Sequence, residues 1–276
     1  MATEQDASKG VVTLARAKEI AGTGHLWIYA GFIHAVRGQP VTGDLVDVVM
    51  PSGRFYARGL YNPDSKIRVR ILTFHEEPIT PAFWRERIAQ AVRLRSRIAP
   101  ETTAYRLIYG EADRLPGLIV DRYDDVLVMQ TLSSGMDRRK EMLADLLCDA
   151  TASVRVYLRN DAKSRLLEAL SPVTGFLRGD GGTTIEVREG AARFLVDIAR
   201  GQKTGWFCDQ RENRLAAARL TAGKRVLEVF CHTGAFGIQA ALAGASHVEG
   251  LDVSEEALIL AREHARLNGV QERCSY

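Results

Sequence analysis

A turn between residues 230 and 237 carries the most distinctive chemistry in the sequence. The nearly continuous apolar run Arg225-Val-Leu-Glu-Val-Phe230 predicts a strand, and Thr233-Gly234-Ala235-Phe236-Gly237 leads from it into a helix over 235–243. Glycines let a backbone approach a ligand closely, and a helix N-terminus offers unpaired N–H groups. Asp252 follows 18 residues after Gly234, at the end of the next expected strand, 247–251. A carboxylate there can accept hydrogen bonds from two ribose hydroxyls.

The turn lacks the G-x-G-x-x-G pattern of dinucleotide sites, because position 232 is a histidine. The pattern therefore disfavours ligands that contain a pyrophosphate, such as NAD and FAD. It favours a nucleoside ligand such as S-adenosylmethionine. A glycine-containing turn between a strand and a helix can also serve packing alone, but the carboxylate of Asp252 at the strand end favours a cofactor site.

The four cysteines, Cys148, Cys208, Cys231 and Cys274, are separated by 60, 23 and 43 residues. The sequence contains no Cys-x-x-Cys pair and no Cys/His cluster, so we expect neither a metal site nor a disulfide framework. We interpret Cys231 as a packing thiol in the turn and Cys274 as an ordinary strand residue. Reduced thiols of this kind are typical of a cytoplasmic protein.

The composition is that of a folded chain: 46% of the 276 residues are hydrophobic and 26% are charged. Disorder is excluded as the main state, because such a chain can bury enough apolar surface to offset its ordering entropy. No run of 18 apolar residues is present, and the first ten residues are polar. We therefore expect no membrane span, no secretory signal and a cytoplasmic protein.

The excess of basic over acidic residues lies in the first part of the chain. Residues 1–100 contain 14 Lys and Arg against 9 Asp and Glu, whereas residues 101–276 contain 23 against 25. Such a bias favours a polyanionic partner such as RNA, contacted mainly through phosphates. Arginines on a solvated surface are the alternative. The candidate RNA-binding residues are Arg54, Arg58, Lys66, Arg68, Arg70, Arg93, Arg95 and Arg97.

The first 75 residues read as short strands joined by turns rich in Gly, Pro, Asn and Asp, which suggests a small barrel. We expect these strands at 11–14, 32–36, 45–50, 54–60 and 67–72, with a short helical piece around Ala15–Ile20. A long helix follows over Pro81–Ile98, because proline suits a first turn and Pro100 lies just beyond the end.

The remainder alternates strands and helices, so the predicted fold class is mixed α/β. Strands are expected at 105–109, 118–123, 126–131, 154–158, 183–188 and 192–197, and helices at 136–150 and 161–169. Helices at 208–221, 235–243 and 254–268 then flank the strands 225–230 and 247–251. The predicted domains are a barrel in 1–75, an α+β domain in 76–200 and the first half of a doubly wound, Rossmann-like sheet in 201–276.

Several segments together resemble one family. They are GHLWIYAGFI (24–33), GDLVDVV (43–49), RGLYNPDSKIRVRIL (58–72), GEADRLPGLIVDRY (110–123), LNG (267–269), and GQKTGWFCDQRENR (201–214) followed by VLEVFCHTGAFG. The chain resembles class I methyltransferases of the large-subunit ribosomal RNA family, the cytosine-C5 enzymes with an N-terminal PUA domain. The resemblance implies a PUA barrel, a methyltransferase domain, S-adenosylmethionine as cofactor and ribosomal RNA as partner. It leaves a homodimer open.

The resemblance also implies a set of cofactor-binding residues. They lie in the F-x-x-Q-x-x-N stretch, in the turn and at the following strand end: Phe207, Gln210, Phe230, Thr233, Gly234, Phe236 and Asp252. Two positions depart from the family pattern. Glu228 stands where the family usually has Asp, and His232 where it usually has Tyr.

The resemblance implies no catalytic residue in this chain. In the family, the catalytic cysteine and an Asp-Pro-Pro loop follow the third strand of the sheet, and this sequence ends at Cys274-Ser275-Tyr276. Cytosine-C5 methylation needs a thiolate that adds to the base. We therefore expect a C-terminally truncated chain that is inactive alone. The buried run Val226–Phe230 also needs a neighbouring strand on each side.

Three functions remain open. The first is a ribosomal RNA methyltransferase, and the second is an RNA-binding PUA protein whose methyltransferase part is inactive. The third is a methyltransferase of small molecules that merely shares the fold. The PUA-like front and its basic bias argue against the third.

Overall fold

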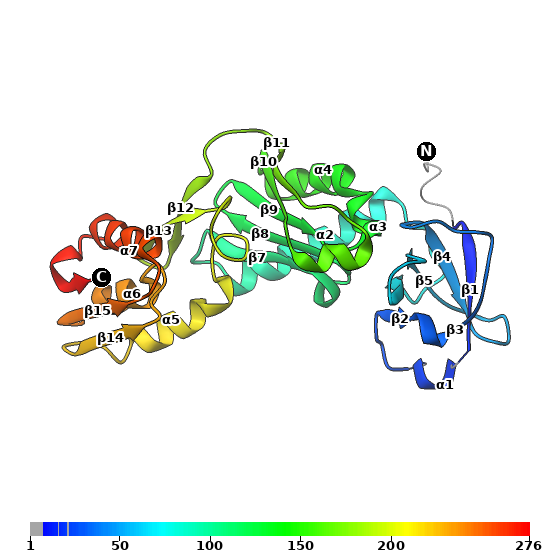
Figure 1. Cartoon of the computed structure of the whole chain (residues 1–276), viewed down its shortest axis with the longest axis horizontal. Coiled ribbons are helices and arrows are strands. Elements are labelled where there is room, and N and C mark those ends of the chain that lie inside the picture. The colour runs from blue at the N-terminus through cyan, green and yellow to red at the C-terminus, as the bar shows by residue number, and fades with distance from the viewer. Residues whose placement is uncertain (1–7, 16, 21) are drawn as a thin grey trace. The chain divides into compact units, whose positions relative to one another are not determined.

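The computed structural model describes residues 8–15, 17–20 and 22–276. The chain divides into two structural units (Figure 1). Unit 1 consists of Met1–Arg97, Leu107–Val120 and Leu127–Asp180, and unit 2 of Ile98–Arg106, Asp121–Val126 and Gly181–Tyr276. In the described part of the chain, no helix is both long and apolar enough to cross a membrane.

Unit 1 begins with a six-stranded sheet in the order β2-β6-β5-β4-β1-β3. Its strands are β1 (Gly10–Leu14), β2 (Trp27–Tyr29), β3 (Ile33–Arg37), β4 (Leu45–Val49), β5 (Phe55–Tyr61) and β6 (Ile67–Thr73), with α1 (Ala17–Ile20) and the 3₁₀ turn η2 (Ala30–Phe32) between them. Buried residues of these strands form one apolar cluster, which includes Val12, Val48 and Ile71. β1 pairs in parallel with β4, and the other neighbouring strands pair antiparallel.

These strands confirm the β-rich front that the sequence predicts. The sequence pattern does not predict the three-residue strand β2, because it is too short to show an alternation. The predicted helical piece around Ala15–Ile20 is found as α1, and its residue Arg16 lies outside the described residues.

Helix α2 (Pro81–Ile98) forms as predicted, with proline in its first turn. Trp84, Ile88, Ala91 and Arg95 are its buried residues, and their spacing of three or four residues defines one face. The helix precedes a five-stranded sheet in the order β11-β10-β9-β8-β7. Its strands are β7 (Ala104–Tyr109), β8 (Leu118–Tyr123), β9 (Val126–Thr131), β10 (Arg155–Asn160) and β11 (Val173–Arg178).

Short helices connect these strands: η3 (Gly110–Asp113), α3 (Ser134–Asp137), α4 (Lys140–Thr151) and η4 (Lys163–Glu168). Two sequence-based expectations need correction here. The helix expected at 161–169 is the 3₁₀ helix η4, and the sequence pattern does not predict β11. β11 lies at the edge of the sheet with no buried residue, so it lacks the apolar signal of a buried strand.

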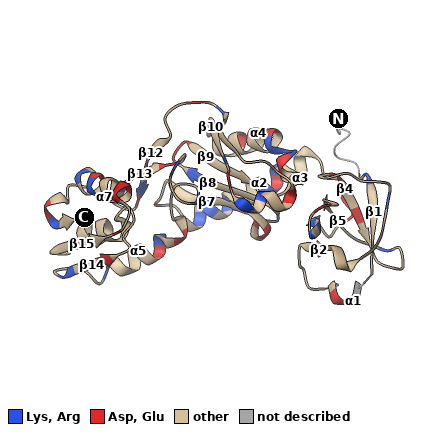
Figure 2. Ribbon diagram, in the orientation of Figure 1, with Lys and Arg blue, Asp and Glu red and all other residues tan. Residues whose placement is uncertain are grey.

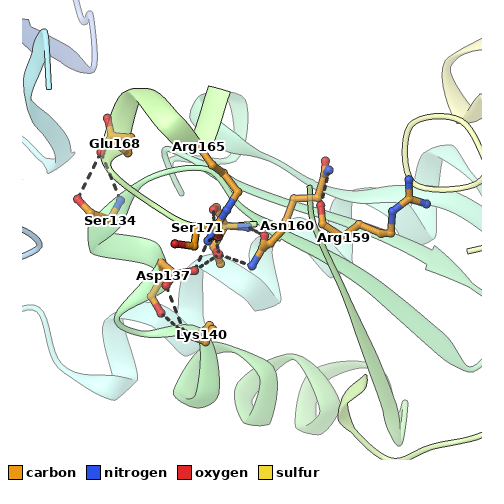
Figure 3. Close-up of polar contacts among 10 residues, drawn as sticks. Ser134, Asp137, Lys140, Arg159, Asn160, Arg165, Glu168 and Ser171 are labelled. Atoms are coloured by element: carbon orange, nitrogen blue, oxygen red, sulfur yellow. Dashed lines mark hydrogen bonds and ion pairs between the residues drawn. The ribbon is translucent and has the colours of Figure 1, made fainter. Parts of the chain in front are cut away.

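A buried carboxylate, Glu168, joins the first sheet of unit 1 to the connections of the second. The side chain is 4% exposed and accepts hydrogen bonds from Asn62 Nδ2 (2.9 Å), Ser65 Oγ (2.7 Å) and Arg70 Nη2 (3.1 Å). The backbone N–H and the hydroxyl of Ser134 approach it from α3 at 3.3 Å (Figure 3). Burial alone would raise the pKa of Glu168, but these donors and the charge of Arg70 lower it.

A second polar cluster lies beside it in Figure 3. Arg165 on η4 donates to the carbonyl and hydroxyl of Thr131 and to Asp137 Oδ1. The Asn160 side chain exchanges two hydrogen bonds with Thr131, at 2.7 and 2.9 Å. The ends of β9 and β10 are therefore fixed to α3 and η4 by hydrogen bonds between largely buried polar groups.

Unit 2 combines a hairpin with a small parallel sheet. The hairpin is β12 (Thr184–Glu189) and β13 (Ala192–Asp197), and the parallel sheet has the order β14-β15-β16. Its strands are β14 (Arg225–Val229), β15 (His247–Leu251) and the two-residue β16 (Cys274–Ser275). The helical elements are η5 (Cys208–Gln210), α5 (Arg211–Ala218), α6 (Ala235–Leu242), α7 (Glu255–Leu267) and η6 (Gln271–Arg273).

The strand–helix alternation from residue 225 onward confirms the pattern predicted from the sequence, and the Ser254 hydroxyl caps α7 by accepting from Ala257 N–H. The helix expected at 208–221 is instead a 3₁₀ turn followed by a shorter α-helix. A buried ion pair connects α5 to the end of β12. Arg214 and Glu189 are 2% and 1% exposed and meet in two hydrogen bonds of 2.7 and 2.5 Å, and the Gln239 amide donates to the Glu189 carbonyl.

Glu168 supports a stability prediction for unit 1. Substitution of Glu168 by Ala should cost about 3 kcal/mol or more, because it leaves the largely buried Arg70 with only its 3.5 Å contact to Glu111 and leaves several donors without an acceptor. Urea unfolding followed by hydrogen exchange in peptides from β5 and β6 measures this loss. Glu86→Ala, in an exposed pair with Arg93, is the control and should leave the midpoint unchanged.

The same carboxylate should make unit 1 sensitive to acid. The pKa of Glu168 is lower in the folded than in the unfolded chain, so its stabilisation is complete at neutral pH and is lost as the pH falls through the acidic range. A Glu168→Ala variant whose midpoint falls with acid as steeply as that of the unchanged chain would contradict this assignment.

Candidate functional site

The turn from Phe230 to Gly234 has an alternating backbone conformation. Phe230, His232 and Gly234 all have positive φ angles, at 61°, 50° and 73°. Glycine adopts this region without penalty, whereas Phe and His do so at a cost, which is typical of a turn held in place for a function. Two backbone hydrogen bonds close the turn, from Cys231 N to Leu251 O (3.0 Å) and from Gly234 N to Cys231 O (2.8 Å).

Asp252 lies next to this turn, at the end of β15. Its Oδ2 accepts a hydrogen bond from His232 N–H at 2.8 Å, and its Oδ1 accepts one from Ser254 N–H at 3.0 Å. These bonds, from Ser254 first and then His232, lower the pKa of Asp252. The carboxylate is therefore ionised at neutral pH, and each oxygen retains a lone pair for a further donor. This is the arrangement required to receive two neighbouring hydroxyl groups.

Glu228 on β14 points beneath the first turn of α6. Its Oε2 accepts a hydrogen bond from Gly237 N–H at 2.8 Å. A Cβ at residue 237 would come within 2.7 Å of that oxygen, so only glycine permits the contact. Burial raises the pKa of Glu228 to about 7, against the opposing effect of the N–H groups of Gly237 and Phe236. Near neutral pH this carboxyl group is divided between its protonated and ionised forms.

His264 on α7 fixes the turn from the other side. The imidazole is fully buried, and its Nδ1 lies 2.9 Å from the carbonyl oxygen of Thr233. That oxygen can only accept, so Nδ1 carries the proton. Nε2 then accepts from the Leu195 N–H at 2.8 Å, with the Leu195 carbonyl also at 3.2 Å. Burial lowers the pKa of His264, which keeps the ring neutral. His264 therefore connects the turn to the hairpin.

Tyr276 packs on glycines around the turn. Its ring would lie within 2.4 to 2.9 Å of a Cβ at Gly234, Gly237 or Gly250, and its hydroxyl donates to the Gly234 carbonyl at 3.3 Å. The three glycines therefore leave room for the Tyr276 ring beside the turn.

The structure brings together most of the residues that the sequence nominates for cofactor binding. Phe230, Thr233, Gly234 and Phe236 lie in the turn and the first turn of α6, with Asp252 bonded to the turn backbone. Phe230 is 83% exposed, whereas Thr233 is buried. These roles themselves stay predictions.

Two further predicted residues precede α5. The ring of Phe207 meets that of His232 edge to face at 5.5 Å and lies under Lys203 Nζ, which is 4.4 Å away. Gln210 accepts a hydrogen bond from Asn213 on the adjoining helix. Sequence reasoning does not identify His264 as a site residue, and it does not show that the Glu228 side chain is partly buried beneath α6. Their burial and their hydrogen-bond partners depend on residues in other elements of the chain, which leave no local pattern.

The cysteines lack the properties of a nucleophile. Burial raises the pKa of all four thiols, to about 11 for Cys231, so they are protonated at neutral pH. Among the residues that the structure describes, no cluster of three or more His, Cys, Asp or Glu side chains could hold a metal ion.

Three of the arginines predicted to bind RNA are largely buried and have carboxylate partners within unit 1. Arg58 pairs with Asp47, Arg70 with Glu168 and Glu111, and Arg95 with Asp113. Their side chains are 10 to 15% exposed.

The other five differ in exposure. Arg93 is exposed but pairs with Glu86, and half-buried Arg68 lies 3.5 Å from the Asn62 carbonyl. The remaining three side chains are exposed: Arg54, Lys66 and Arg97. Phosphate binding by any of the eight stays a prediction.

Two family models match the chain. Residues 13–74 match PUA-like domains, and residues 151–276 match S-adenosylmethionine-dependent methyltransferases. The chain therefore contains a PUA-like domain and a methyltransferase domain of the S-adenosylmethionine-dependent class. This confirms the cofactor that the sequence predicts.

Similar proteins carry a more specific name. Proteins called ribosomal RNA large subunit methyltransferase I from Shewanella denitrificans and Aeromonas hydrophila are 43% and 41% identical, over 90% and 89% of this chain. The chain spans 64% and 63% of the length of these two relatives.

Solved structures share the fold. A Streptococcus mutans protein assigned as an S-adenosylmethionine-dependent methyltransferase superposes with a TM-score of 0.77 at 19% identity, over 96% of this chain and 69% of that one. SMU.776, assigned as a methyltransferase and crystallised with S-adenosylhomocysteine, gives 0.78 at 20% identity, over 97% and 69%.

His264 supports a prediction for unit 2. Because its pKa is lower in the folded than in the unfolded chain, the stability that depends on the neutral ring is present above pH 6.5 and is lost as the pH falls below it. His264→Ala should cost about 2 kcal/mol, since it leaves the Leu195 N–H buried without an acceptor. It should also weaken the dependence on pH.

The measurement is urea unfolding of unit 2 at pH 5.5 and 8, read from hydrogen exchange in β13 and α7. His34→Asn, at an exposed position on β3, serves as the control. Since burial also lowers the pKa of His232 and raises that of Glu228 to about 7, a residual pH effect is expected from these two groups. An unchanged pH dependence in His264→Ala would disprove the neutral assignment.

Proposed function

We propose that this chain is part of an S-adenosylmethionine-dependent methyltransferase that acts on large-subunit ribosomal RNA in the cytoplasm, with cytosine C5 as the methylated atom. The observation that carries the proposal is the turn at 230–234 beside the ionised Asp252, in a region that matches the methyltransferase family. The relatives named as ribosomal RNA large subunit methyltransferase I support RNA as the substrate.

The described residues fit the cofactor. Asp252 has one uncommitted lone pair on each oxygen, which suits the two ribose hydroxyls of an adenosine. The exposed ring of Phe230 offers an apolar surface next to it. His264 and Glu228 hold the turn and the start of α6 in position. When bound, S-adenosylmethionine supplies a methyl group on a sulfonium that a nucleophilic carbon can accept.

We further propose that residues 201–276 are the first half of a doubly wound sheet. β14, β15 and β16 are parallel neighbours in chain order, joined by helical crossovers, as in the start of such folds. Leu227, Val229 and Leu251 are 49 to 61% exposed, although a parallel sheet normally has both faces covered. Further chain packed on this surface would explain the exposure.

The cofactor site can be tested by calorimetry with S-adenosylhomocysteine. We expect weak binding by the chain, and Asp252→Ala should abolish it because the acceptors for both ribose hydroxyls are lost. Glu249→Ala, an exposed carboxylate on the same strand, is the matched control and should bind as the unchanged chain does. Equal binding by Asp252→Ala would refute the assignment. Absence of binding by every variant would favour an RNA-binding protein with an inactive methyltransferase part.

Methyl transfer gives a separate prediction. Cytosine-C5 chemistry needs a thiolate, and burial holds all four cysteines in the thiol form. Residues 1–276 alone should therefore transfer no tritiated methyl groups to unmodified large-subunit RNA. Turnover that is lost in Cys231→Ala or Cys274→Ala would show that a cysteine of this chain acts as nucleophile. Turnover that survives both substitutions would show that the reaction does not depend on either thiol.

RNA binding should depend on the exposed basic residues of unit 1. Figure 2 shows Lys and Arg along α2. Replacing Arg54, Lys66 and Arg97 by Ala should lower the slope of log affinity against log salt by about 0.7–0.9 for each phosphate that is no longer bound. Filter binding of ribosomal RNA fragments between roughly 50 and 200 mM salt measures the slope. Arg178→Ala, whose side chain pairs with Glu141 and Asp145, should not change it. Affinity independent of salt would argue against phosphate binding.

A further inference from the structure

Unit 1 contains a cavity of about 620 Å³ that the chemistry described so far does not use. It lies between the segment that leads into β2 and the turn η3, and Phe74 also lines it. Aromatic side chains, His25 and Trp27, meet a carboxylate, Glu111, and a cation, Arg114, at its wall. A cavity that combines aromatic rings with a few charged groups has the composition of a ligand site.

The indole of Trp27 is held in one orientation although it is only half-buried. Its Nε1–H donates to Glu111 Oε1 at 2.7 Å, and the guanidinium of Arg70 lies over the ring at 5.6 Å. Arg70 is itself fixed by the buried Glu168 at 3.1 Å. The His25 ring meets Trp27 edge to face at 5.6 Å. An accessible aromatic ring that is held by a hydrogen bond and a cation is a preorganised stacking surface.

The charged groups of the cavity have unused capacity. The Glu111 side chain is 37% exposed, and in the described part of the chain only its Oε1 accepts hydrogen bonds, from Trp27 and, at 3.5 Å, Arg70. Arg114 is exposed and forms no ion pair with a described residue. The guanidinium of Arg114 therefore has donors available for an anion such as a phosphate.

We propose that this cavity binds an unpaired guanine nucleotide of RNA, with the base against Trp27, its N1–H and N2–H groups on Glu111 and its phosphate on Arg114. Guanine presents two adjacent donors on its pairing edge, which a carboxylate can accept together. Adenine, cytosine and uracil each place a ring nitrogen or carbonyl acceptor beside their donor, and a carboxylate repels it. Stacking of unpaired bases on aromatic side chains is the usual way in which proteins recognise single-stranded RNA.

The inference rests on the proposed RNA partner but names a different contact. The exposed residues Arg54, Lys66 and Arg97 would bind phosphates of any sequence, whereas the cavity would select one base. The site needs neither S-adenosylmethionine nor methyl transfer. Its test can therefore fail or succeed independently of the cofactor and the reaction.

Tryptophan fluorescence of the full chain provides the measurement. Of the three tryptophans, Trp84 and Trp206 are 0% and 4% exposed, so an added base can reach only Trp27. The probes are short oligoribonucleotides of uracil that carry a single central guanine, adenine or cytosine, with the all-uracil strand as reference. We expect quenching at the lowest concentration with the guanine strand, about tenfold or more below the others.

Three variants define the outcome. Glu111→Gln retains an acceptor for Trp27 Nε1 and should abolish the preference for guanine while leaving stacking in place. Arg114→Ala should weaken the binding of every strand, whereas Arg37→Ala, an exposed arginine of the same sheet as Trp27, should not. Equal quenching by all four strands, or a guanine preference that survives Glu111→Gln, would overturn the proposal. If none of the four strands quenches the unchanged chain but ribosomal RNA still binds in a salt-dependent way, the proposed site is wrong and the proposed function still stands.

Discussion

An ionised carboxylate can be buried only where several donors meet it, and this constraint organises both units. Glu168 gathers Asn62, Ser65, Arg70 and Ser134 around one side chain, so the first sheet of unit 1 is tied to α3 and η4. In unit 2, the Glu189 carboxylate accepts from Arg214 of α5 and, at 3.4 Å, from the Gln239 amide of α6. Apolar packing brings these elements close, but it has no direction, whereas each hydrogen bond requires one geometry. The polar groups therefore select one arrangement among those that the core would allow.

Hydrogen bonds to polar groups also fix the turn of the candidate cofactor site. Its turn places two bulky residues, Phe230 and His232, in the left-handed region, and the strain is held by contacts from three directions. Asp252 accepts from the turn backbone, His264 donates to the Thr233 carbonyl, and Leu251 closes the strand end. The backbone of the turn is thus preorganised before a ligand binds. The Asp252 carboxylate and the exposed Phe230 ring can still contact a ligand.

The sequence predicted the parts of the fold that depend on local pattern. Strands with alternating burial, such as β1 and β12, and helices with a proline or a serine at the start, such as α2 and α7, leave a signal within a few residues. β11 leaves none, because it is an edge strand whose place is fixed by pairing with β10. In the site, Gly234 and Asp252 could be found from their spacing. His264 could not, since its partners Thr233 and Leu195 lie 31 and 69 residues away. The pairing of Arg58, Arg70 and Arg95 with carboxylates was equally invisible, because charge composition does not tell which basic residues are already neutralised.

The dependence of the first sheet on Glu168 has a consequence for the order in which the chain folds during synthesis. All six strands of the sheet can pair once β6 has emerged from the ribosome, because β6 is the last of them in the sequence and pairs with β2. Its buried donors at residues 62, 65 and 70 must then wait for residue 168, which is 98 positions after residue 70. At an elongation rate of roughly 5–20 residues per second, that interval is roughly 5–20 s, far longer than a small sheet needs to form. During this time Arg70 has no buried partner, so the nascent sheet persists in a less stable form. Its final stability is therefore reached as a late step, when η4 docks.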